Sequence, residues 1–116
     1  MKRILIVDDE PLIRFSLARA LEDLAEVETA DTGSNANARI NACFYDICFL
    51  DICLPDINGL DIMREISRIS PETKVVIMTA YADDRVRNKI GKEAYRFLEK
   101  PLDLSQVKAI VQHLPV

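Results

Sequence analysis

The chain has 116 residues, of which 49% are hydrophobic and 29% charged. This length and composition are typical of a single globular domain whose core needs no disulfide or structural metal, so we expect residues 1–116 to form one domain. With 15 Lys and Arg against 19 Asp and Glu, the net charge of -4 and the lack of a basic run argue against direct nucleic-acid binding. No apolar stretch approaches the ~20 residues of a membrane helix and no signal peptide precedes the first acidic residues, so we expect a cytoplasmic protein. The three cysteines, Cys43, Cys48 and Cys53, are an odd number without a C-x-x-C pair, which indicates reduced thiols.

The first half of the chain predicts two helices between three strands. Ile4 to Val7 is a short, fully apolar run, typical of a strand buried on both faces. Pro11 suits the first turn of a helix. The apolar residues that follow it at helical spacing are Leu12, Ile13, Leu17, Ala20, Leu21 and Leu24. Weaker patterns predict a strand over 27–30 and a helix over 34–42, and a strongly apolar run predicts a strand over 47–50.

The second half continues the alternation. Residues 54–59 have turn chemistry, and the helix after them carries Leu60, Met63, Ile66 and Ile69 inward. A strand is predicted over 75–78, a polar and loosely anchored helix over 83–90, and a last strand over 95–98. A final helix is predicted from apolar residues at helical spacing, which are Leu104, Val107, Ile110, Val111 and Leu114.

Five strands alternating with five helices predict an α/β fold with a parallel sheet covered on both sides. In such sheets ligands bind outside the carboxyl ends of the strands, where the strand order reverses. The residues that follow the apolar part of four strands are polar: Asp8 and Asp9, Asp51, Thr79 and Lys100. We therefore expect these side chains to converge on one edge of the sheet.

Carboxylates gathered at one edge repel each other unless a cation intervenes, and all-oxygen ligands favour Mg²⁺ with phosphate completing its shell. Lys100 and the Thr79 hydroxyl suit phosphoryl oxygens, and Asp51 can attack phosphorus to form an aspartyl phosphate. Taken singly, each of these residues is more simply a helix cap or a solvated side chain, and the convergence is what favours a site. Asp46, Asp56 and Asp61 show no such convergence and are interpreted as solvated faces or turns.

The ordered set resembles the receiver domains of two-component response regulators over nearly the whole chain. The matching pieces are Asp8-Asp9, the run from Asp51 to Gly59 (DICLPDING), Thr79-Ala80 and Lys100-Pro101. The resemblance implies a flavodoxin-like sheet of order 2-1-3-4-5. It also implies a phosphoacceptor rather than a turnover enzyme, with weak self-dephosphorylation.

The site residues implied by this resemblance are specific. Asp51 would be phosphorylated; Asp8, Asp9, Asp51 and the Cys53 carbonyl would hold Mg²⁺, Asp8 through a bound water; Thr79, Ala80 and Lys100 would contact the phosphoryl group; and Pro101 would follow a cis peptide. Thr79 and Phe97 would form the switch, although Phe97 is equally well explained as a core strand residue. The implied partners are a sensor histidine kinase or phosphotransfer protein and, as a homodimer, a second copy joined through the fourth helix, fifth strand and fifth helix.

Several positions depart from the common pattern of the family. Glu93-Ala94 replaces the usual Gly-Ala, which puts the loop after the fourth helix in question. Tyr81 and Cys53 flank the expected path of the attacking water, so a bulky Tyr81 predicts slow hydrolysis of the phosphoryl group. Cys53 is better explained as a small filler than as a redox thiol, and His113 as a cation near a helix end.

Two rival functions share parts of this pattern. A haloacid-dehalogenase-type phosphatase also uses a strand-end aspartyl nucleophile with Mg²⁺, but it needs an aspartate at the position of Cys53. A flavin-binding module needs a phosphate-cradling first loop, which Asp8-Asp9-Glu10 would repel.

Overall fold

The computed structural model describes residues 1–80, 84–91 and 93–114. Strands and helices alternate along the chain. The strands are β1 (Lys2–Val7), β2 (Ala25–Ala30), β3 (Ile47–Asp51), β4 (Lys74–Thr79) and β5 (Arg96–Glu99). The helices are α1 (Pro11–Leu21), α2 (Gly33–Ala42), α3 (Gly59–Ile69), α4 (Asp84–Ile90) and α5 (Leu104–Gln112).

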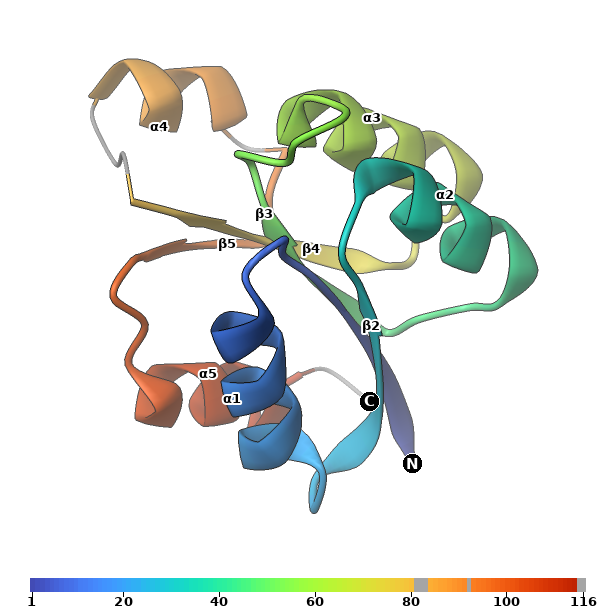
Figure 1. Ribbon diagram of the computed structural model, residues 1–116, viewed down its shortest axis with the longest axis vertical. Helices are drawn as coiled ribbons and strands as arrows, with labels where there is room; N and C mark the ends of the chain where they lie inside the picture. The colour runs from blue at the N-terminus through green and yellow to red at the C-terminus, as the bar shows by residue number, and fades with distance from the viewer. Residues whose placement is uncertain (81–83, 92, 115–116) are drawn as a thin grey trace.

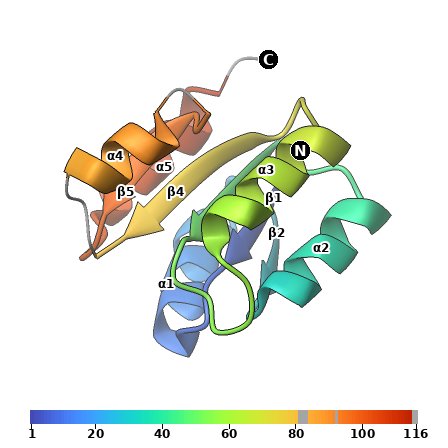
Figure 2. The same cartoon turned by 90° about the horizontal axis from the view of Figure 1, so that it is seen from above.

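The strands form one parallel sheet in the order β2-β1-β3-β4-β5. Helices α1 and α5 lie on one face of the sheet, and α2 and α3 cover the other (Figures 1 and 2). The predicted α/β fold and its strand order are therefore confirmed. The order reverses between β1 and β3, so the carboxyl ends of these two strands border the crevice where ligands bind in such sheets.

The central strands divide the core into two layers. Ile4 to Val7 have no exposed surface, which confirms the predicted strand buried on both faces. Leu5 and Val7 pack with α2 and α3, whereas Ile4 and Ile6 pack with α1 and α5, because successive side chains of a strand point to opposite faces. This packing on both sides fixes the register of the strands and thus the positions of their polar ends.

Two glycines shape segments next to that edge. A Cβ on Gly59 would lie 2.3 Å from the Cα of Ile52, so this position admits only glycine and lets α3 begin directly against the segment after β3. Gly91 has a φ of +51° and follows the last residue of α4, where a left-handed residue commonly ends a helix.

Some sequence predictions differ from the structure. Leu12 and Leu104, predicted to face inward, are 77% and 39% exposed. Each lies in the first turn of its helix, which begins a few residues after the carboxyl end of a strand. The last strand begins at Arg96 rather than Tyr95. The predicted helix over 83–90 begins at Asp84, residue 83 lying outside the described residues, and its Ile90 is buried.

Candidate functional site

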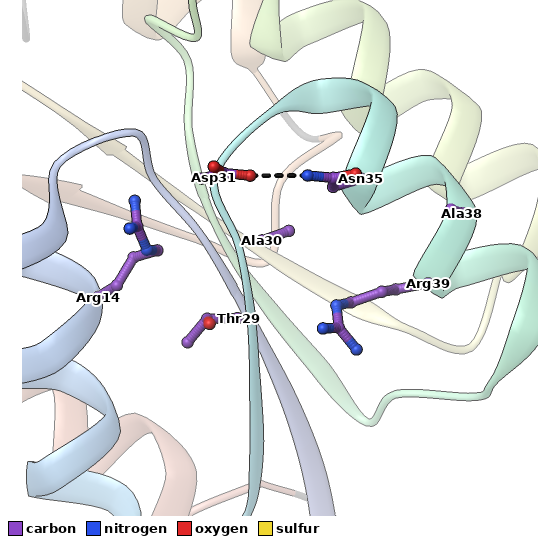
Figure 3. Close-up of a pocket in the computed structure, with 7 residues that line it drawn as sticks. All are labelled: Arg14, Thr29, Ala30, Asp31, Asn35, Ala38 and Arg39. Atoms are coloured by element: carbon purple, nitrogen blue, oxygen red, sulfur yellow. Dashed lines mark hydrogen bonds between the residues drawn. The ribbon is translucent and has the colours of Figure 1, made fainter.

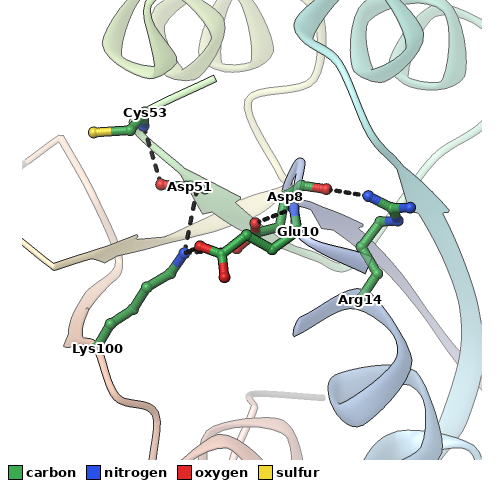
Figure 4. Close-up of polar contacts among 6 residues, drawn as sticks. All are labelled: Asp8, Glu10, Arg14, Asp51, Cys53 and Lys100. Atoms are coloured by element: carbon green, nitrogen blue, oxygen red, sulfur yellow. Dashed lines mark hydrogen bonds and ion pairs between the residues drawn. The ribbon is translucent and has the colours of Figure 1, made fainter. Parts of the chain in front are cut away.

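Three of the predicted site residues meet at the carboxyl edge of the sheet. Asp8 follows β1, Asp51 ends β3, and Lys100 follows β5. The Nζ atom of Lys100 lies 2.9 Å from Oδ2 of Asp8 and 3.3 Å from Oδ2 of Asp51 (Figure 4). The parallel sheet thus brings together side chains that are 92 and 49 residues apart in the chain.

A third carboxylate, Glu10, joins this cluster and was missed by sequence reasoning. Its Oε1 lies 3.4 Å from Nζ of Lys100. Carboxylate oxygens of Asp8, Asp9 and Glu10 also lie within 4.8 Å of one another, which is close enough to share a metal ion. The run Asp8-Asp9-Glu10 was the available signal, but only the first two residues matched the family pattern.

The residues of the cluster differ in burial: the less exposed ones form its floor, and the exposed ones form its rim. Asp8 is fully buried, Asp51 is 4% exposed, and the side chain of Lys100 is 12% exposed. Asp9 and Glu10 are exposed. The single ammonium of Lys100 therefore faces two buried carboxylates, Asp8 and Asp51, where little water can screen their charge. A hard divalent cation with oxygen ligands fits such an excess of negative charge.

The electrostatics of the floor follow from this arrangement. Burial raises the pKa of Asp51, and the charge of Asp8 adds to the rise, while the Cys53 N–H and Lys100 oppose it. The Cys53 N–H donates to Oδ1 of Asp51 at 3.0 Å. Burial alone would lower the pKa of Lys100, but its hydrogen bond to Asp8 and the nearby carboxylate charges outweigh burial and raise it. Lys100 is therefore a permanent cation.

The turn that carries the acidic residues is held from two sides. The backbone N–H of Glu10 donates to Oδ1 of Asp8 at 2.9 Å. An Nη1 atom of Arg14, from α1, donates to the Asp8 carbonyl oxygen at 2.8 Å (Figure 4). These bonds fix the Asp8 carboxylate toward Lys100. No pattern in the sequence singled out Arg14.

The remaining predicted residues lie along β4 and β5. Thr79 ends β4 fully buried, and its carbonyl accepts the Lys100 N–H at 2.8 Å; Ala80, the next residue, is exposed. The peptide between Lys100 and Pro101 is cis, as predicted. Phe97 is partly buried, and the guanidinium carbon of Arg87 lies 5.1 Å from the centre of its ring.

The cysteines differ in environment. The Cys53 side chain is exposed, and its sulfur points away from Lys100 (Figure 4). Burial and the charge of Asp51 raise the pKa of this thiol, which disfavours the thiolate that a redox role needs. Cys48 is buried, and burial raises its pKa to about 12, whereas Cys43 is only partly buried. Tyr81 lies outside the described residues.

Two acids interpreted as solvated have specific partners. Asp56 is exposed, yet its carboxylate accepts the backbone N–H groups of Gly33 at 2.8 Å and Ser34 at 3.0 Å, which ties the segment after β3 to the start of α2. Asp46 accepts the Arg3 N–H at 2.8 Å. Their partners lie more than 20 residues away in the chain, beyond the reach of pattern reasoning. His113 is the C-cap residue of α5, so its predicted position near a helix end is confirmed.

Comparison with known proteins shows the family. Residues 4–112 match the family described as the response regulator receiver domain, and the chain belongs to it. It is 31% identical to the DNA-binding transcriptional regulator NtrC of Salmonella typhimurium and 35% identical to the transcriptional regulatory protein CutR of Streptomyces coelicolor. These matches cover 92% and 97% of this chain but 23% and 52% of the two relatives.

Solved structures agree with this assignment. A CheY-like receiver domain protein from Methanospirillum hungatei is 30% identical, with a TM-score of 0.91 over 97% of this chain and 91% of that one. The response regulator TrrA of Thermotoga maritima, solved with Mg²⁺ and beryllofluoride, is 35% identical, with a TM-score of 0.87 over 99% of this chain and 100% of that one. None of the comparisons named here points to the phosphatase alternative. Within the described residues, every helix is too short or too polar to cross a bilayer.

Proposed function

We propose that Asp51 accepts a phosphoryl group from a phosphohistidine of a sensor histidine kinase or phosphotransfer protein. In this step an Oδ atom of Asp51 bonds to phosphorus, the P–N bond breaks, and the imidazole nitrogen leaves with the bonding electron pair. The observation that carries the proposal is the position of Lys100, whose ammonium lies between the carboxylates of Asp51 and Asp8. It neutralises the charge of a phosphoryl group on Asp51 without leaving its place.

The same site has the chemistry to hold Mg²⁺. Asp8, Asp9, Asp51 and the Cys53 carbonyl are the proposed ligands, Asp8 through a bound water, and Glu10 adds a further carboxylate at the rim. When bound, Mg²⁺ balances the excess of carboxylates and the charge of the phosphoryl oxygens. The TrrA structure supports this assignment, because it holds Mg²⁺ with beryllofluoride in a chain 35% identical to this one.

The switch that we propose begins with Thr79. A phosphoryl group on Asp51 adds roughly -1.5 to -2 charges and strong acceptors. The Thr79 hydroxyl and the Ala80 N–H then turn toward these acceptors, and Phe97 moves into the space that Thr79 leaves. Arg87 supports a link from Phe97 to α4, because its guanidinium lies over the Phe97 ring. The surface of α4, β5 and α5 changes as a result, and either an output partner or a second copy of the chain binds there.

The remaining features of the proposal concern the whole protein. Residues 1–116 act as one receiver domain in the cytoplasm, without contacting nucleic acid directly and without turning over outside substrates. The single sheet supports one domain, and the net charge of -4 supports the lack of direct contact with nucleic acid. The phosphoryl form is long-lived because of Tyr81, so Tyr81→Ala would speed its hydrolysis.

Labelling by acetyl phosphate tests the proposal. With Mg²⁺, the intact mass of the wild-type chain gains one phosphoryl group, whereas Asp51→Asn gains none. Asp56→Asn is the matched control, because Asp56 is an exposed carboxylate on the same segment that contacts α2 rather than Lys100. Labelling of Asp51→Asn at the wild-type level would contradict the proposal.

A further inference from the structure

A cleft of about 430 Å³ lies at the outer edge of the sheet, and Arg14, which also holds the turn at Asp8, is among its lining residues. It opens around the carboxyl end of β2, between α1 and α2. Arg14 and Thr29 lie on the α1 side of β2, and Arg39 lies on the α2 side (Figure 3). Two guanidinium groups from different helices thus flank the end of one strand.

The two arginines are held in different ways: Arg14 has no carboxylate partner among the described residues, and Arg39 has one, Glu28. The Arg14 guanidinium donates to the Asp8 carbonyl oxygen and forms no ion pair with the described residues. Arg39 pairs with Glu28, but the same Oε2 of Glu28 also accepts from the Tyr45 hydroxyl at 2.6 Å, and its Oε1 accepts from Arg3 at 2.7 Å. Glu28 therefore stays satisfied if Arg39 turns to another anion.

The strand between the arginines has a free edge. β2 is the outermost strand of the sheet, and no described segment pairs with its second side. Such an edge presents unpaired backbone groups that can hydrogen-bond to an added strand. In an added strand, successive side chains point to opposite faces, so two adjacent residues would reach toward Arg14 and Arg39, one to each.

We propose that this edge binds an extended segment of a partner protein that contains two adjacent acidic residues, by strand addition to β2. One carboxylate pairs with Arg14 and the next with Arg39, while the backbone of the segment bonds along 25–30. Asp31, the acid that lines the cleft, is turned toward α2 by its bond from the Asn35 side-chain amide at 2.7 Å. It weakens binding without blocking either arginine.

A fluorescein-labelled peptide with the sequence Thr-Val-Glu-Glu-Val-Thr tests this proposal by fluorescence anisotropy. The full chain is expected to bind it saturably, and Arg14→Ala and Arg39→Ala are each expected to weaken binding about tenfold. Asp31→Asn is expected to tighten binding. Arg19→Ala, which removes an exposed arginine of α1 outside the cleft, is the matched control and is expected to bind like the wild type.

Geometry and folding have their own controls. A peptide with its glutamates separated by one valine places both carboxylates on one face and is expected to bind about tenfold more weakly. Amide NMR shifts on titration are expected to concentrate in 25–30.

Arg39→Ala does not touch the Lys100 cluster, so its normal labelling by acetyl phosphate would show a folded chain. Absence of saturable binding, equal loss in Arg19→Ala, equal binding of both peptides, or displacement by inorganic phosphate as effective as by peptide would overturn the proposal.

Discussion

Two charged clusters in this molecule have opposite compositions. Around Lys100, one ammonium faces the carboxylates of Asp8, Asp51 and Glu10 at 2.9, 3.3 and 3.4 Å. Around Glu28, one carboxylate instead faces three donors. They are Arg3 at 2.7 Å, Arg39 at 2.5 Å and the Tyr45 hydroxyl at 2.6 Å.

The difference between them separates the proposed ion site from a structural contact. The hydrogen bond from Tyr45 and the two arginines hold the pKa of Glu28 below its usual value, so its charge is fully satisfied. At the Lys100 cluster, burial and Asp8 raise the pKa of Asp51 although Lys100 is close. An excess of buried negative charge disfavours the folded state and is relieved when a cation binds. The Glu28 cluster stabilises the fold, whereas the excess of carboxylates around Lys100 suits a bound cation.

Removal of the lysine is expected to have the largest effect. Lys100→Met leaves Asp8 and Asp51 buried without their cation and should lower the free energy of unfolding by roughly 2 to 3 kcal/mol at neutral pH. Lys108→Met, at an exposed position of α5, is the control and should change it little. Urea unfolding in the presence of a chelator measures both. Equal stability of the two variants would mean that Lys100 does not hold the carboxylates together.

Neutralising Glu28 is expected to have a smaller effect. Glu28→Gln keeps an acceptor for Tyr45 but loses the charge that pairs with Arg3 and Arg39, and about 1.5 kcal/mol should be lost at neutral pH. Because the folded-state pKa of Glu28 is lowered, this contribution is present above the ordinary glutamate pKa and disappears as the pH falls through the folded-state value. Denaturant unfolding over a series of acid pH values checks this, and a constant difference between variant and wild type would contradict it.

Neutralising Asp51 should have the opposite sign. Without metal, Asp51→Asn removes a charge that burial and Asp8 disfavour and should stabilise the chain by about 1 kcal/mol at neutral pH. The gain should shrink as the pH falls, because the raised pKa lets wild-type Asp51 take up its proton first in the folded state. Saturating Mg²⁺ should reverse the order, since it stabilises the wild type more. If Asp51→Asn were less stable than the wild type in the presence of a chelator, the site would not hold an unfavourable excess of negative charge.

The smallest effect is expected for Arg39. Arg39→Ala leaves Glu28 with Arg3 and Tyr45, and the exposed pair that it removes is worth only about 0.3 kcal/mol. Thermal unfolding, compared with Arg19→Ala as an exposed control, measures this difference. A loss as large as that of Glu28→Gln would show that the donors around Glu28 are not redundant.

The sequence predicted the fold and the floor of the site for one reason. Apolar strand runs end in polar residues that packing does not select, and parallel strands place those ends together, as for Asp8, Asp51 and Lys100. Contacts between side chains of exposed segments follow no period. Glu10 on Lys100, Arg14 on the Asp8 carbonyl and Asp56 on the start of α2 depend on where loops and helices come to lie. Leu12 shows a limit of the helical pattern itself. It fits the apolar spacing but is exposed, because the spacing does not say which residues of a helix lie over the sheet.

The most direct test of the account is to locate the acyl phosphate chemically. Borohydride reduces an aspartyl phosphate to homoserine, which mass spectrometry of the digested chain can place in the sequence. After treatment with acetyl phosphate and Mg²⁺, we expect homoserine at position 51 alone, and none when a chelator replaces Mg²⁺. Homoserine at position 8, 9 or 56, or equal yields with and without Mg²⁺, would contradict it.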